Sequence, residues 1–399
     1  MGVDPPDERR RLLVIGAGPA QLGLLRAARE RGLAVVACDR DREALGLRFV
    51  DRHAVVSTED EEAIEDVARA ESVDGLVAPG IDWPVAIAAR VAARLGLPHP
   101  LTVEAAEATV SKRRQRERFD SSRVPQPRWR LATSADLDAD LPCVVKPSDR
   151  QGQVAVSLAR NADELRAALE AALAASRSGE ALVEELVAGP EVTVNAFSAR
   201  GRFRPLAVTD RLTAEPPAFG VALAHAWPSD DRVDQAVDAA RRAAEALGVR
   251  EGPTYTQVRM ATDGPRVIEL AARLGGGHDA ELCEAALAID LNALTIAAAL
   301  GRRAGVPPAR PAGGACVRFL VASPGRLVGV EGVEAALAVD GVLDAVPYRP
   351  PGWRFGPLRV GADRAGFVLA RGDSRADALA RADAAVERIR FHVDAADAN

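Results

Sequence analysis

The chain has 399 residues, of which 48% are hydrophobic and 27% are charged, and its formal net charge is −6. This length accommodates two or three domains with a large core, and the acidic balance argues against nucleic acid or an anionic membrane as a partner. No apolar run reaches the roughly 18 residues that cross a bilayer, and the polar N-terminus has no signal-peptide pattern. We therefore expect a cytoplasmic protein that begins with a short disordered tail over residues 1–10.

Strands and helices alternate through residues 11–100. Apolar runs predict strands at Leu12–Ile15, Ala34–Cys38 and Gly75–Ala78, and longer stretches predict helices over Asp60–Ala70 and Val85–Leu95. Such alternation is typical of a parallel sheet with helices on its faces. We predict a doubly wound α/β domain over residues 11–100.

Three further units follow in the chain. Residues 101–187 combine a helix over Val103–Phe119, a strand at Cys143–Lys146, a helix that begins at Asn161 and a strand at Ala181–Glu185. Residues 188–305 hold strands at Glu191–Ser198 and Phe203–Asp210, a hairpin over Tyr255–Ala272 and a helix over Ala280–Leu300. A Pro-rich linker opens residues 306–399, a small α/β module that ends in a helix over Ser374–Arg390.

The four cysteines are Cys38, Cys143, Cys283 and Cys316. None of them stands in a C-x-x-C spacing, and the first two lie inside apolar runs. We expect buried, reduced thiols, in preference to zinc ligands or disulfides.

A glycine loop follows the first predicted strand. Gly16-Ala17-Gly18-Pro19 begins like a dinucleotide-binding fingerprint, and Asp39 follows the second strand where a ribose-binding acid could lie. Gln21, however, occupies the place of the third glycine of G-x-G-x-x-G. We therefore favour a tight turn that lines a substrate site, and keep an NAD-binding oxidoreductase as the weaker alternative.

Of the 51 Lys and Arg residues, only Lys112 and Lys146 are Lys. Lys146 ends a predicted strand before a Gly-containing loop, an arrangement that can neutralise a polyphosphate, although a solvated lysine at a strand end is an ordinary feature too. The segment 183–191 then forms a strand, a turn and a strand. Its backbone could contact an adenine edge and Glu191 could contact ribose hydroxyls, although an acidic hairpin explains this segment equally well.

The hairpin over Tyr255–Ala272 is the most informative segment. Thr262-Asp263-Gly264 predicts a three-residue loop, whose register places Gln257 directly opposite Glu269. The same face then carries Ala271 and Arg273, while Ile268 falls on the opposite, apolar face. Oxygen ligands in this number suit Mg²⁺, which leaves coordination positions for phosphates. A half-exposed hairpin with a polar outer face is the alternative.

The order of these motifs resembles the ATP-grasp superfamily. The likeness covers about residues 11–390 and rests on Lys112, Lys146-Pro147, Val183-Glu184-Glu185, Gly189-Pro190-Glu191, Gln257 and the run from Glu269 to Gly277. It is nearest to carboxylate–amine ligases such as the L-amino acid ligases, and single carbamoyl-phosphate synthetase modules are also similar. The resemblance implies a mixed α/β and α+β fold: a doubly wound parallel-sheet domain, an ATP-grasp region with a mobile lid, and a C-terminal α+β module.

The resemblance also implies roles for individual residues. ATP would bind with Mg²⁺, which Mn²⁺ could replace. Lys112 and Lys146 would contact the phosphates. Glu184, with the backbone of Glu185 and Val187, would contact the adenine, and Glu191 would contact the ribose. Gln257 and Glu269 would hold the metal, and Arg273, the expected catalytic residue together with Lys146, would contact the transferred phosphate or the acyl phosphate. His225 and His278 are candidate substrate contacts, with ordinary hydrogen-bonded histidines as the alternative.

The sequence departs from the superfamily pattern at three places. Gln257 stands where most members have Glu, Ala271 stands where many have Asn, and Val154-Ala155 stands where the lid commonly has a further glycine. These departures leave a regulatory nucleotide-binding protein with little catalysis as an alternative. The favoured function is ATP-dependent ligation of a small carboxylate and an amine, amino acids among them, with release of ADP and phosphate. A homodimer is compatible with this function.

Overall fold

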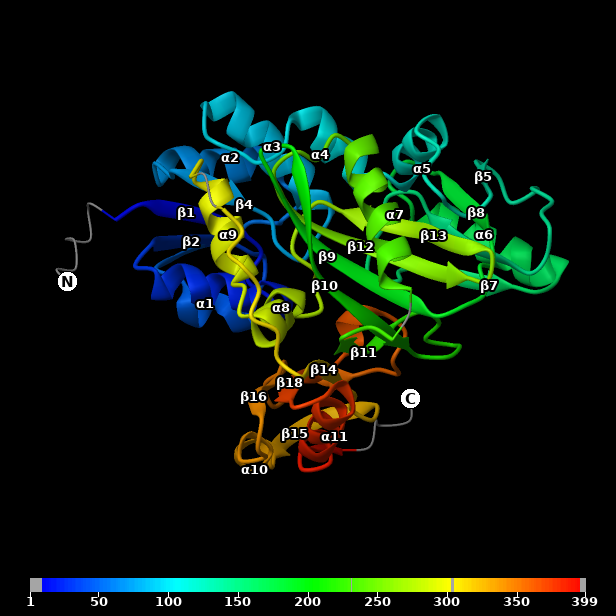
Figure 1. Cartoon of the computed structure of the whole chain (residues 1–399). Helices are drawn as coiled ribbons and strands as arrows, with labels where there is room; N and C mark the ends of the chain where they lie inside the picture. The colour runs from blue at the N-terminus through cyan, green and yellow to red at the C-terminus, as the bar shows by residue number, and fades with distance from the viewer. Residues whose placement is uncertain (1–8, 231, 303–304, 395–399) are drawn as a thin grey trace.

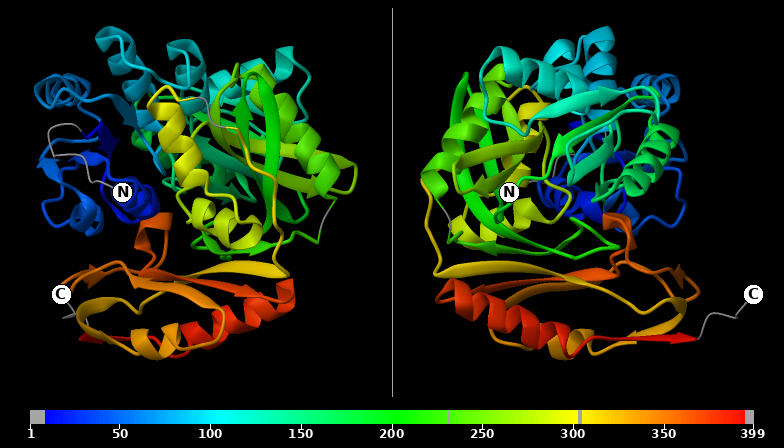
Figure 2. Two further views of the ribbon diagram at one scale, coloured as in Figure 1. Left: turned by 60° about the vertical axis from the view of Figure 1, so that its left-hand side comes forward. Right: turned by 90° about the vertical axis from the view of Figure 1, so that its right-hand side faces the viewer.

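The computed structural model describes residues 9–230, 232–302 and 305–394. The predicted tail lies outside these ranges, except for Arg9 and Arg10. The ribbon forms an upper body and a lower module made by the C-terminal part of the chain (Figure 1, Figure 2). Within the described ranges, no helix has the length and apolar character needed to cross a membrane.

A four-stranded parallel sheet opens the chain, in the order β3-β2-β1-β4. Its strands are β1 (Arg11–Ile15), β2 (Ala34–Cys38), β3 (Arg52–Ala54) and β4 (Gly75–Val77). The helices are α1 (Leu22–Glu30), α2 (Glu61–Ala70) and α3 (Trp83–Leu95), with short 3-10 turns η1 (Pro19–Gln21) and η2 (Leu45–Phe49). All residues of β2 are buried, as in a strand that is covered on both faces. The predicted parallel α/β arrangement is confirmed.

The predicted helix over Val103–Phe119 is in fact two helices, α4 (Val103–Val110) and α5 (Lys112–Ser121). Ser111 between them has extended backbone angles, and its hydroxyl accepts a hydrogen bond from the backbone N–H of Arg114 at 3.3 Å. A serine in this position caps the following helix, which a hydrophobic pattern alone does not reveal. The break makes Lys112 the first residue of α5.

A four-stranded antiparallel sheet follows, in the order β5-β8-β6-β7. Its strands are β5 (Trp129–Ala132), β6 (Cys143–Pro147), β7 (Ser157–Ala159) and β8 (Ala181–Glu185), and α6 (Ala162–Ala175) packs on it. Asn161 caps α6 as predicted, because its side chain accepts a hydrogen bond from the Glu164 N–H at 2.9 Å. The loop between β6 and β7 is the predicted lid.

The largest sheet has eight strands, in the order β13-β12-β9-β10-β11-β14-β18-β16. In the upper body it contains β9 (Glu191–Ala199), β10 (Arg202–Thr213), β11 (Ala222–Trp227), β12 (Gly252–Ala261) and β13 (Gly264–Ala271). The associated helices are α7 (Val233–Ala246), α8 (Asp279–Leu287) and α9 (Leu291–Ala299). The predicted single helix over Ala280–Leu300 is therefore broken, because Ala288 has a φ of +55° and Asp290 caps α9.

The C-terminal module continues the same large sheet. It adds β14 (Gly314–Leu320), β16 (Val342–Pro347) and β18 (Gly366–Gly372), so hydrogen bonds run across the domain limit proposed at residues 305 and 306. A separate sheet contains β15 (Gly325–Glu331), β17 (Arg354–Phe355) and β19 (Arg390–Asp394). The module also holds α10 (Val333–Leu337), η3 (Gly361–Asp363) and α11 (Arg375–Val386), and α11 lies at the bottom of both views in Figure 2.

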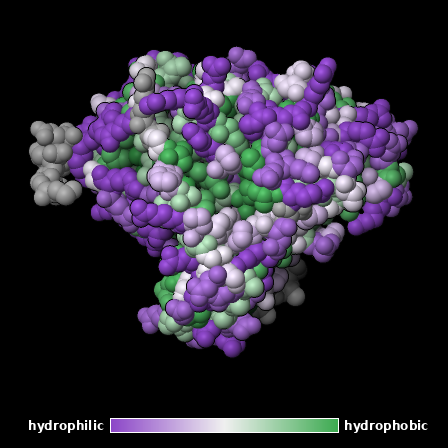
Figure 3. Space-filling view, viewed as in Figure 1, coloured by the Kyte–Doolittle hydropathy of each residue, from purple (hydrophilic) through white to green (hydrophobic). Residues whose placement is uncertain are grey.

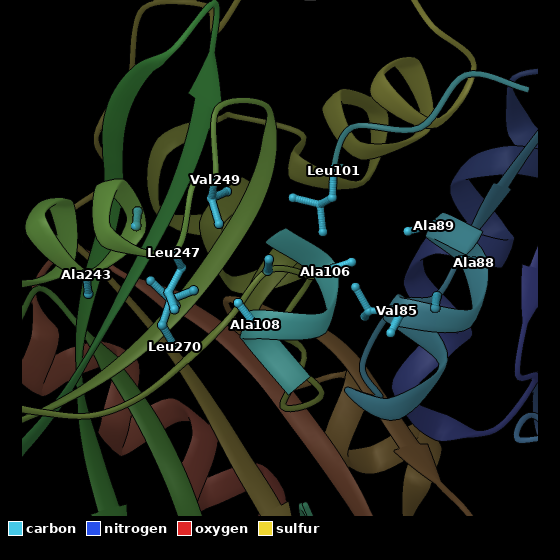
Figure 4. Close-up of a cluster of buried hydrophobic side chains, with 14 of the residues drawn as sticks. Val85, Ala88, Ala89, Leu101, Ala106, Ala108, Ala243, Leu247, Val249 and Leu270 are labelled. Carbon is cyan, nitrogen blue, oxygen red and sulfur yellow. The ribbon is translucent and has the colours of Figure 1, made fainter. Parts of the chain in front are cut away.

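A shared core joins the first domain to the large sheet. One buried cluster contains Val85 of α3, Ala106 of α4, Leu247 at the end of α7 and Leu270 of β13 (Figure 4). On the face seen in Figure 3, hydrophilic residues dominate and apolar residues appear in smaller groups between them. The prediction of buried, reduced cysteines is confirmed, since all four are free and buried.

Candidate active site

A cavity of about 380 Å³ lies where the first domain, the lid, the large sheet and the C-terminal module meet. The lining residues of the first domain include Pro19, Ala20 and Asp82, and those of the C-terminal module include Tyr348, Arg349 and Arg364. All of the predicted nucleotide, metal and phosphate ligands line it: Lys112, Lys146, Glu184, Glu185, Val187, Glu191, Gln257, Glu269 and Arg273. Residues far apart in the chain therefore meet around one space.

Both lysines are almost fully buried in the cavity wall, with 7% of Lys112 and 4% of Lys146 exposed. The Lys112 ammonium donates to the backbone carbonyl of Arg150 at 2.6 Å and lies 2.9 Å from a carboxylate oxygen of Glu269. The Lys146 ammonium lies 2.8 Å from Glu184. These partners hold both positive charges beside the cavity, where a polyphosphate would meet them.

Glu184 forms a buried cluster with two cations. One carboxylate oxygen accepts from Arg116 Nε at 2.8 Å and the other is paired with Lys146. Burial raises the pKa of Glu184, but the charges of Arg116 and Lys146 outweigh it and lower the pKa to about 2. Glu184 is thus an anion that positions Lys146. Sequence reasoning missed Arg116, because it lies in an Arg-rich helix where nothing distinguishes it from its surface neighbours.

The predicted pairing of Gln257 with Glu269 is correct, but the predicted turn is wrong. Gly264 pairs with Ala261 and has a φ of +135°, so only Thr262 and Asp263 remain in the loop. A bulge at Ile268 absorbs the missing residue and restores the predicted register at Glu269.

The bulge also changes which face Ile268 occupies. Ile268 and Glu269 both line the cavity, whereas the sequence pattern placed Ile268 on the packed face. Arg116 holds this irregular backbone, since it donates to the carbonyls of Val267 and Ile268 at 3.1 and 2.6 Å. A side chain from α5 therefore stabilises the bulge. No local pattern in the hairpin sequence predicts this contact.

Gln257 and Glu269 suit a divalent cation in the chemistry of their donors. They pair directly across β12 and β13 and present an amide and a carboxylate to the cavity. Burial raises the pKa of Glu269, but the charges of Lys112 and Lys146 prevail and hold it below its usual range, so Glu269 is ionised. No group of three or more His, Cys, Asp or Glu in the described ranges could hold a metal. Two protein ligands are what Mg²⁺ needs when phosphates supply further oxygens.

Arg273 contacts the first domain. Its Nε and a terminal nitrogen lie 2.7 and 2.6 Å from one oxygen of Asp82, and its guanidinium lies over the Tyr255 ring. Asp82 precedes α3 and is 7% exposed. This pair links the large sheet to the first domain at the cavity. Nothing in the sequence points to Asp82, which stands among ordinary loop residues.

Glu191 is held by two arginines from neighbouring strands. Arg211 donates to it at 2.7 Å and Arg259 lies 3.1 Å away. Glu185 accepts from the backbone N–H and Nε of Arg128 at 3.0 and 2.7 Å. The carboxylates of both residues therefore have protein partners already.

The lid bridges two parts of the molecule. The Gln151 side chain accepts a hydrogen bond from the Asp82 N–H, and the Gly152 carbonyl accepts from the Gly361 N–H at 3.1 Å. Gln153 and Ala155 have φ values of +70° and +53°, a region that residues with a Cβ seldom occupy. The lid therefore contacts both the first domain and the C-terminal module.

The two candidate histidines have different positions. His225 lines the cavity, is 1% exposed, and its Nδ1 has no hydrogen-bond partner in the described structure. Burial lowers its pKa to about 4. His278 does not line the cavity: its Nε2 lies 2.6 Å from the Tyr348 hydroxyl and its ring stacks on Phe367. Both rings are neutral at pH 7, since burial also holds the pKa of His278 well below its usual value.

The glycine loop of the first domain lines the cavity with Pro19 and Ala20. The Gln21 side chain packs beneath Gly16 and donates to the Pro79 carbonyl at 2.7 Å. Asp39 accepts from the Ala17 N–H at 2.7 Å. The acid that resembled a ribose ligand is therefore bound to the loop itself.

Two family models match this sequence, the ATP-grasp domain over residues 139–281 and the L-amino acid ligase C-terminal domain 2 over residues 318–394. The first match contains Lys146, the lid and the Gln257–Glu269 pair. The chain therefore contains an ATP-grasp domain and an L-amino acid ligase C-terminal domain. ATP with Mg²⁺ is the cofactor of ATP-grasp domains, and ligases that contain them form carbon–nitrogen bonds with release of ADP.

Curated relatives of this chain differ in name and length. The uncharacterized protein y4rH of Sinorhizobium fredii is 31% identical over 320 residues, which are 76% of this chain and 65% of that protein. A formate-dependent phosphoribosylglycinamide formyltransferase of Synechococcus is 28% identical and the match covers 96% of this chain and 98% of that protein. The chain thus spans just under two thirds of one relative and almost all of the other.

Solved structures show the same fold over nearly the whole chain. The L-amino acid ligase of Bacillus licheniformis superposes with a TM-score of 0.82 at 22% identity, covering 97% of this chain and 99% of that one. Phosphoribosylglycinamide synthetase of Anaerococcus prevotii gives a TM-score of 0.77 at 19% identity, covering 97% and 100%. At these identities the likeness establishes the fold, and the substrates must be argued from the site.

Proposed function

We propose that this protein joins the carboxylate of one small molecule to the amine of another through an acyl phosphate, with release of ADP and phosphate. One observation carries the proposal: two lysines, an oxygen-ligand pair and an arginine from separate segments line one cavity. Positive charges and a metal site beside each other suit the terminal phosphates of ATP. The two family matches support the same reaction class.

The nucleotide is proposed to lie along the wall that carries both lysines. Lys112 and Lys146 would contact its phosphates, and the strand end at Glu185 and Val187 would present backbone groups to adenine. Glu184 would act through Lys146, to which it is paired at 2.8 Å. Glu191, already held by Arg211 and Arg259, would contact the ribose with a fixed carboxylate.

The metal is proposed to bind Gln257 and Glu269, where Mg²⁺ or Mn²⁺ would neutralise phosphate charge. The residues of the chain have their own tasks in the reaction. Lys146 and Arg273 hold the negative charge that moves with the phosphoryl group, and the lid excludes water from the acyl phosphate. The Asp82 carboxylate keeps the Arg273 guanidinium directed into the cavity through two contacts to the same oxygen.

The proposed reaction proceeds in two steps. A carboxylate oxygen attacks the γ-phosphorus of ATP, the bond from that phosphorus to the β–γ bridging oxygen breaks, and ADP leaves. The neutral amine then attacks the acyl carbon, the carbon–oxygen bond to phosphate breaks, and the nitrogen loses one proton. Phosphate is a far better leaving group than oxide, which is why the carboxylate must be activated.

The nature of the substrates is also part of the proposal. The C-terminal match to the L-amino acid ligases and a 29% identity to carnosine synthase 1 of Gallus gallus over 76% of this chain support amino acids as substrates. That match covers 36% of the carnosine synthase chain. The five-part division of the chain, a cytoplasmic location and a homodimer belong to the same proposal.

A coupled assay tests this function. Pairs of amino acids and related acids would be incubated with ATP and Mg²⁺, with ADP and AMP measured separately. Hydroxylamine should trap the activated carboxylate as a hydroxamate in the absence of an amine. ADP that forms only when a carboxylate is present supports the proposal. AMP as the main product contradicts the mechanism, and ATP binding without any turnover favours the regulatory alternative.

A further inference from the structure

Cationic side chains surround the whole cavity, and three of them lack a carboxylate partner in the described ranges: Arg150 of the lid, which donates to the Ala175 carbonyl, and Arg349 and Arg364 of the C-terminal module. Those that are paired, at 2.6–3.1 Å, are Lys112, Lys146, Arg211, Arg259 and Arg273. Arg349 and Arg364 of the C-terminal module line the cavity as well, yet neither forms an ion pair with any residue in the described ranges.

Arg364 is held in a fixed orientation without being neutralised. Its Nε donates to the Gly361 carbonyl at 2.7 Å, and its guanidinium carbon lies 3.8 Å from the centre of the Phe319 ring. No described residue accepts a hydrogen bond from its two terminal nitrogens. Arg349 is fixed in a similar way, since it stacks on Trp353 at 3.9 Å and donates to the Ala362 carbonyl at 3.3 Å. One turn, η3, thus holds both guanidinium groups.

A guanidinium stays charged at neutral pH, so burial cannot remove the charge of Arg364 as it does that of a histidine. Burial lowers the pKa of Arg364, and the charge of Arg211 adds to this effect. An anion that entered the cavity would relieve this unfavourable environment. The pair of terminal nitrogens matches the two oxygens of a carboxylate.

Arg364 has other neighbours than the expected phosphate ligands. Its guanidinium lies over Phe319 and its Nε donates to Gly361, whereas the two lysines contact Glu269 and Glu184. His225 lines the same region, but its buried Nδ1, which forms no hydrogen bond in the described structure, lies 4.0 Å from a carboxylate oxygen of Asp279. The terminal nitrogens of Arg364 are therefore the unmatched polar groups at this end.

We propose that Arg364, with Arg349 beside it, binds a carboxylate that the reaction does not consume. The inference rests on the proposed ligase function and specifies its substrates. Such a carboxylate has two sources. It belongs to an amino acid whose amino group attacks the acyl phosphate, or it is the second carboxylate of a diacid whose first carboxylate is activated near Arg273.

Hydroxylamine distinguishes the two sources, because it replaces the amine substrate and carries no carboxylate. The variant is Arg364→Met, which keeps an unbranched side chain and removes the charge. Arg359→Met is the matched control, since Arg359 is exposed and precedes the same turn. Amino acids are compared with their carboxamides as amine substrates, and diacids with monoacids as activated substrates, by kcat/KM for ADP or hydroxamate.

If the amine substrate supplies the carboxylate, Arg364→Met lowers kcat/KM for the amino acid by about 100-fold. The kcat/KM for the carboxamide and the kcat/KM for hydroxamate formation then change by no more than about threefold. If the activated substrate supplies it, hydroxamate formation from the diacid falls by the same factor and the monoacid is spared. Equal losses for every substrate, unchanged kinetics, or weaker ATP binding in the variant each overturn the assignment.

A failure of the ligase function itself would be seen separately, as wild-type protein that forms neither ADP nor hydroxamate with any acid. Calorimetry still tests Arg364 in that case. Glycine, glutamate and succinate would be titrated into the protein with MgADP present. Binding that Arg364→Met abolishes and Arg359→Met preserves supports the carboxylate site. Absence of binding, or equal binding by all three proteins, overturns it.

Discussion

Replacing Glu184 by Gln should destabilise the nucleotide-free protein strongly. Glu184 is 3% exposed and is the common partner of Arg116 and Lys146, so the variant leaves two buried cations without their anion. Removing one member of a buried pair costs about 3–5 kcal/mol. The lowering of the Glu184 pKa to about 2 independently gives about 3 kcal/mol at neutral pH.

The effect should depend on pH in a defined direction. A carboxylate whose pKa is lowered by folding stabilises the protein above its unfolded pKa of 4.5, and this contribution is lost as the pH falls toward 2. The difference in the free energy of unfolding between wild type and Glu184→Gln, the stability gap, should therefore have its full size at pH 7 and shrink below pH 4.5. ATP should narrow it at pH 7, because phosphate would supply Lys146 with a new anion.

Urea denaturation followed by tryptophan fluorescence measures this gap, and Trp129 lies directly opposite Glu184 on β5. Glu185→Gln is the matched control. Its pair with Arg128 is largely solvated, so we expect a change of less than about 1 kcal/mol. A Glu184→Gln protein within about 1 kcal/mol of wild type at pH 7, or a gap independent of pH, would refute the reasoning.

Four further outcomes are expected. Lys146→Ala should weaken ATP binding, measured by calorimetry, while the protein still folds, because Glu184 keeps its ion pair with Arg116. Lys146→Arg should also bind ATP more weakly, since a planar guanidinium does not replace an ammonium group. Glu269→Ala should abolish turnover, and Gln257→Ala should raise the Mg²⁺ concentration needed for half-maximal turnover. Equal, small effects of the two variants on turnover would contradict the metal site. His278→Phe should lower thermal stability by about 1–3 kcal/mol, because the Tyr348 hydroxyl loses its partner, and leave KM unchanged. Separate assays for ADP and AMP should find ADP.

The sequence by itself indicated the first parallel sheet, several later strands and most of the candidate ligands, but it joined α4 with α5 and α8 with α9. Apolar runs predicted the parallel sheet, since buried parallel strands need side chains that are apolar on both faces. The rarity of lysine drew attention to Lys112 and Lys146, and both lie in the cavity wall. The spacing in the hairpin predicted the pairing of Gln257 with Glu269. Their roles stay predictions until the variants are measured.

The tertiary structure alone decided what each of these side chains contacts. Arg116, one arginine among many, proved to hold both Glu184 and the bulge at Ile268, and the sequence could not show this because the partners lie on other elements. His278 stands beside a glycine-rich segment that lines the cavity, but its ring turns into the aromatic core behind Tyr348.

Arg364 shows the same limit most clearly. A sequence with 51 Lys and Arg residues cannot reveal which of them lack an acidic partner, because ion pairs form between segments that are distant in the chain. Folding brings η3 to the cavity and stacks Arg364 on Phe319, where no carboxylate of the described residues reaches it. Local patterns determine strands, helices and caps, whereas the balance of charge at a site depends on long-range packing.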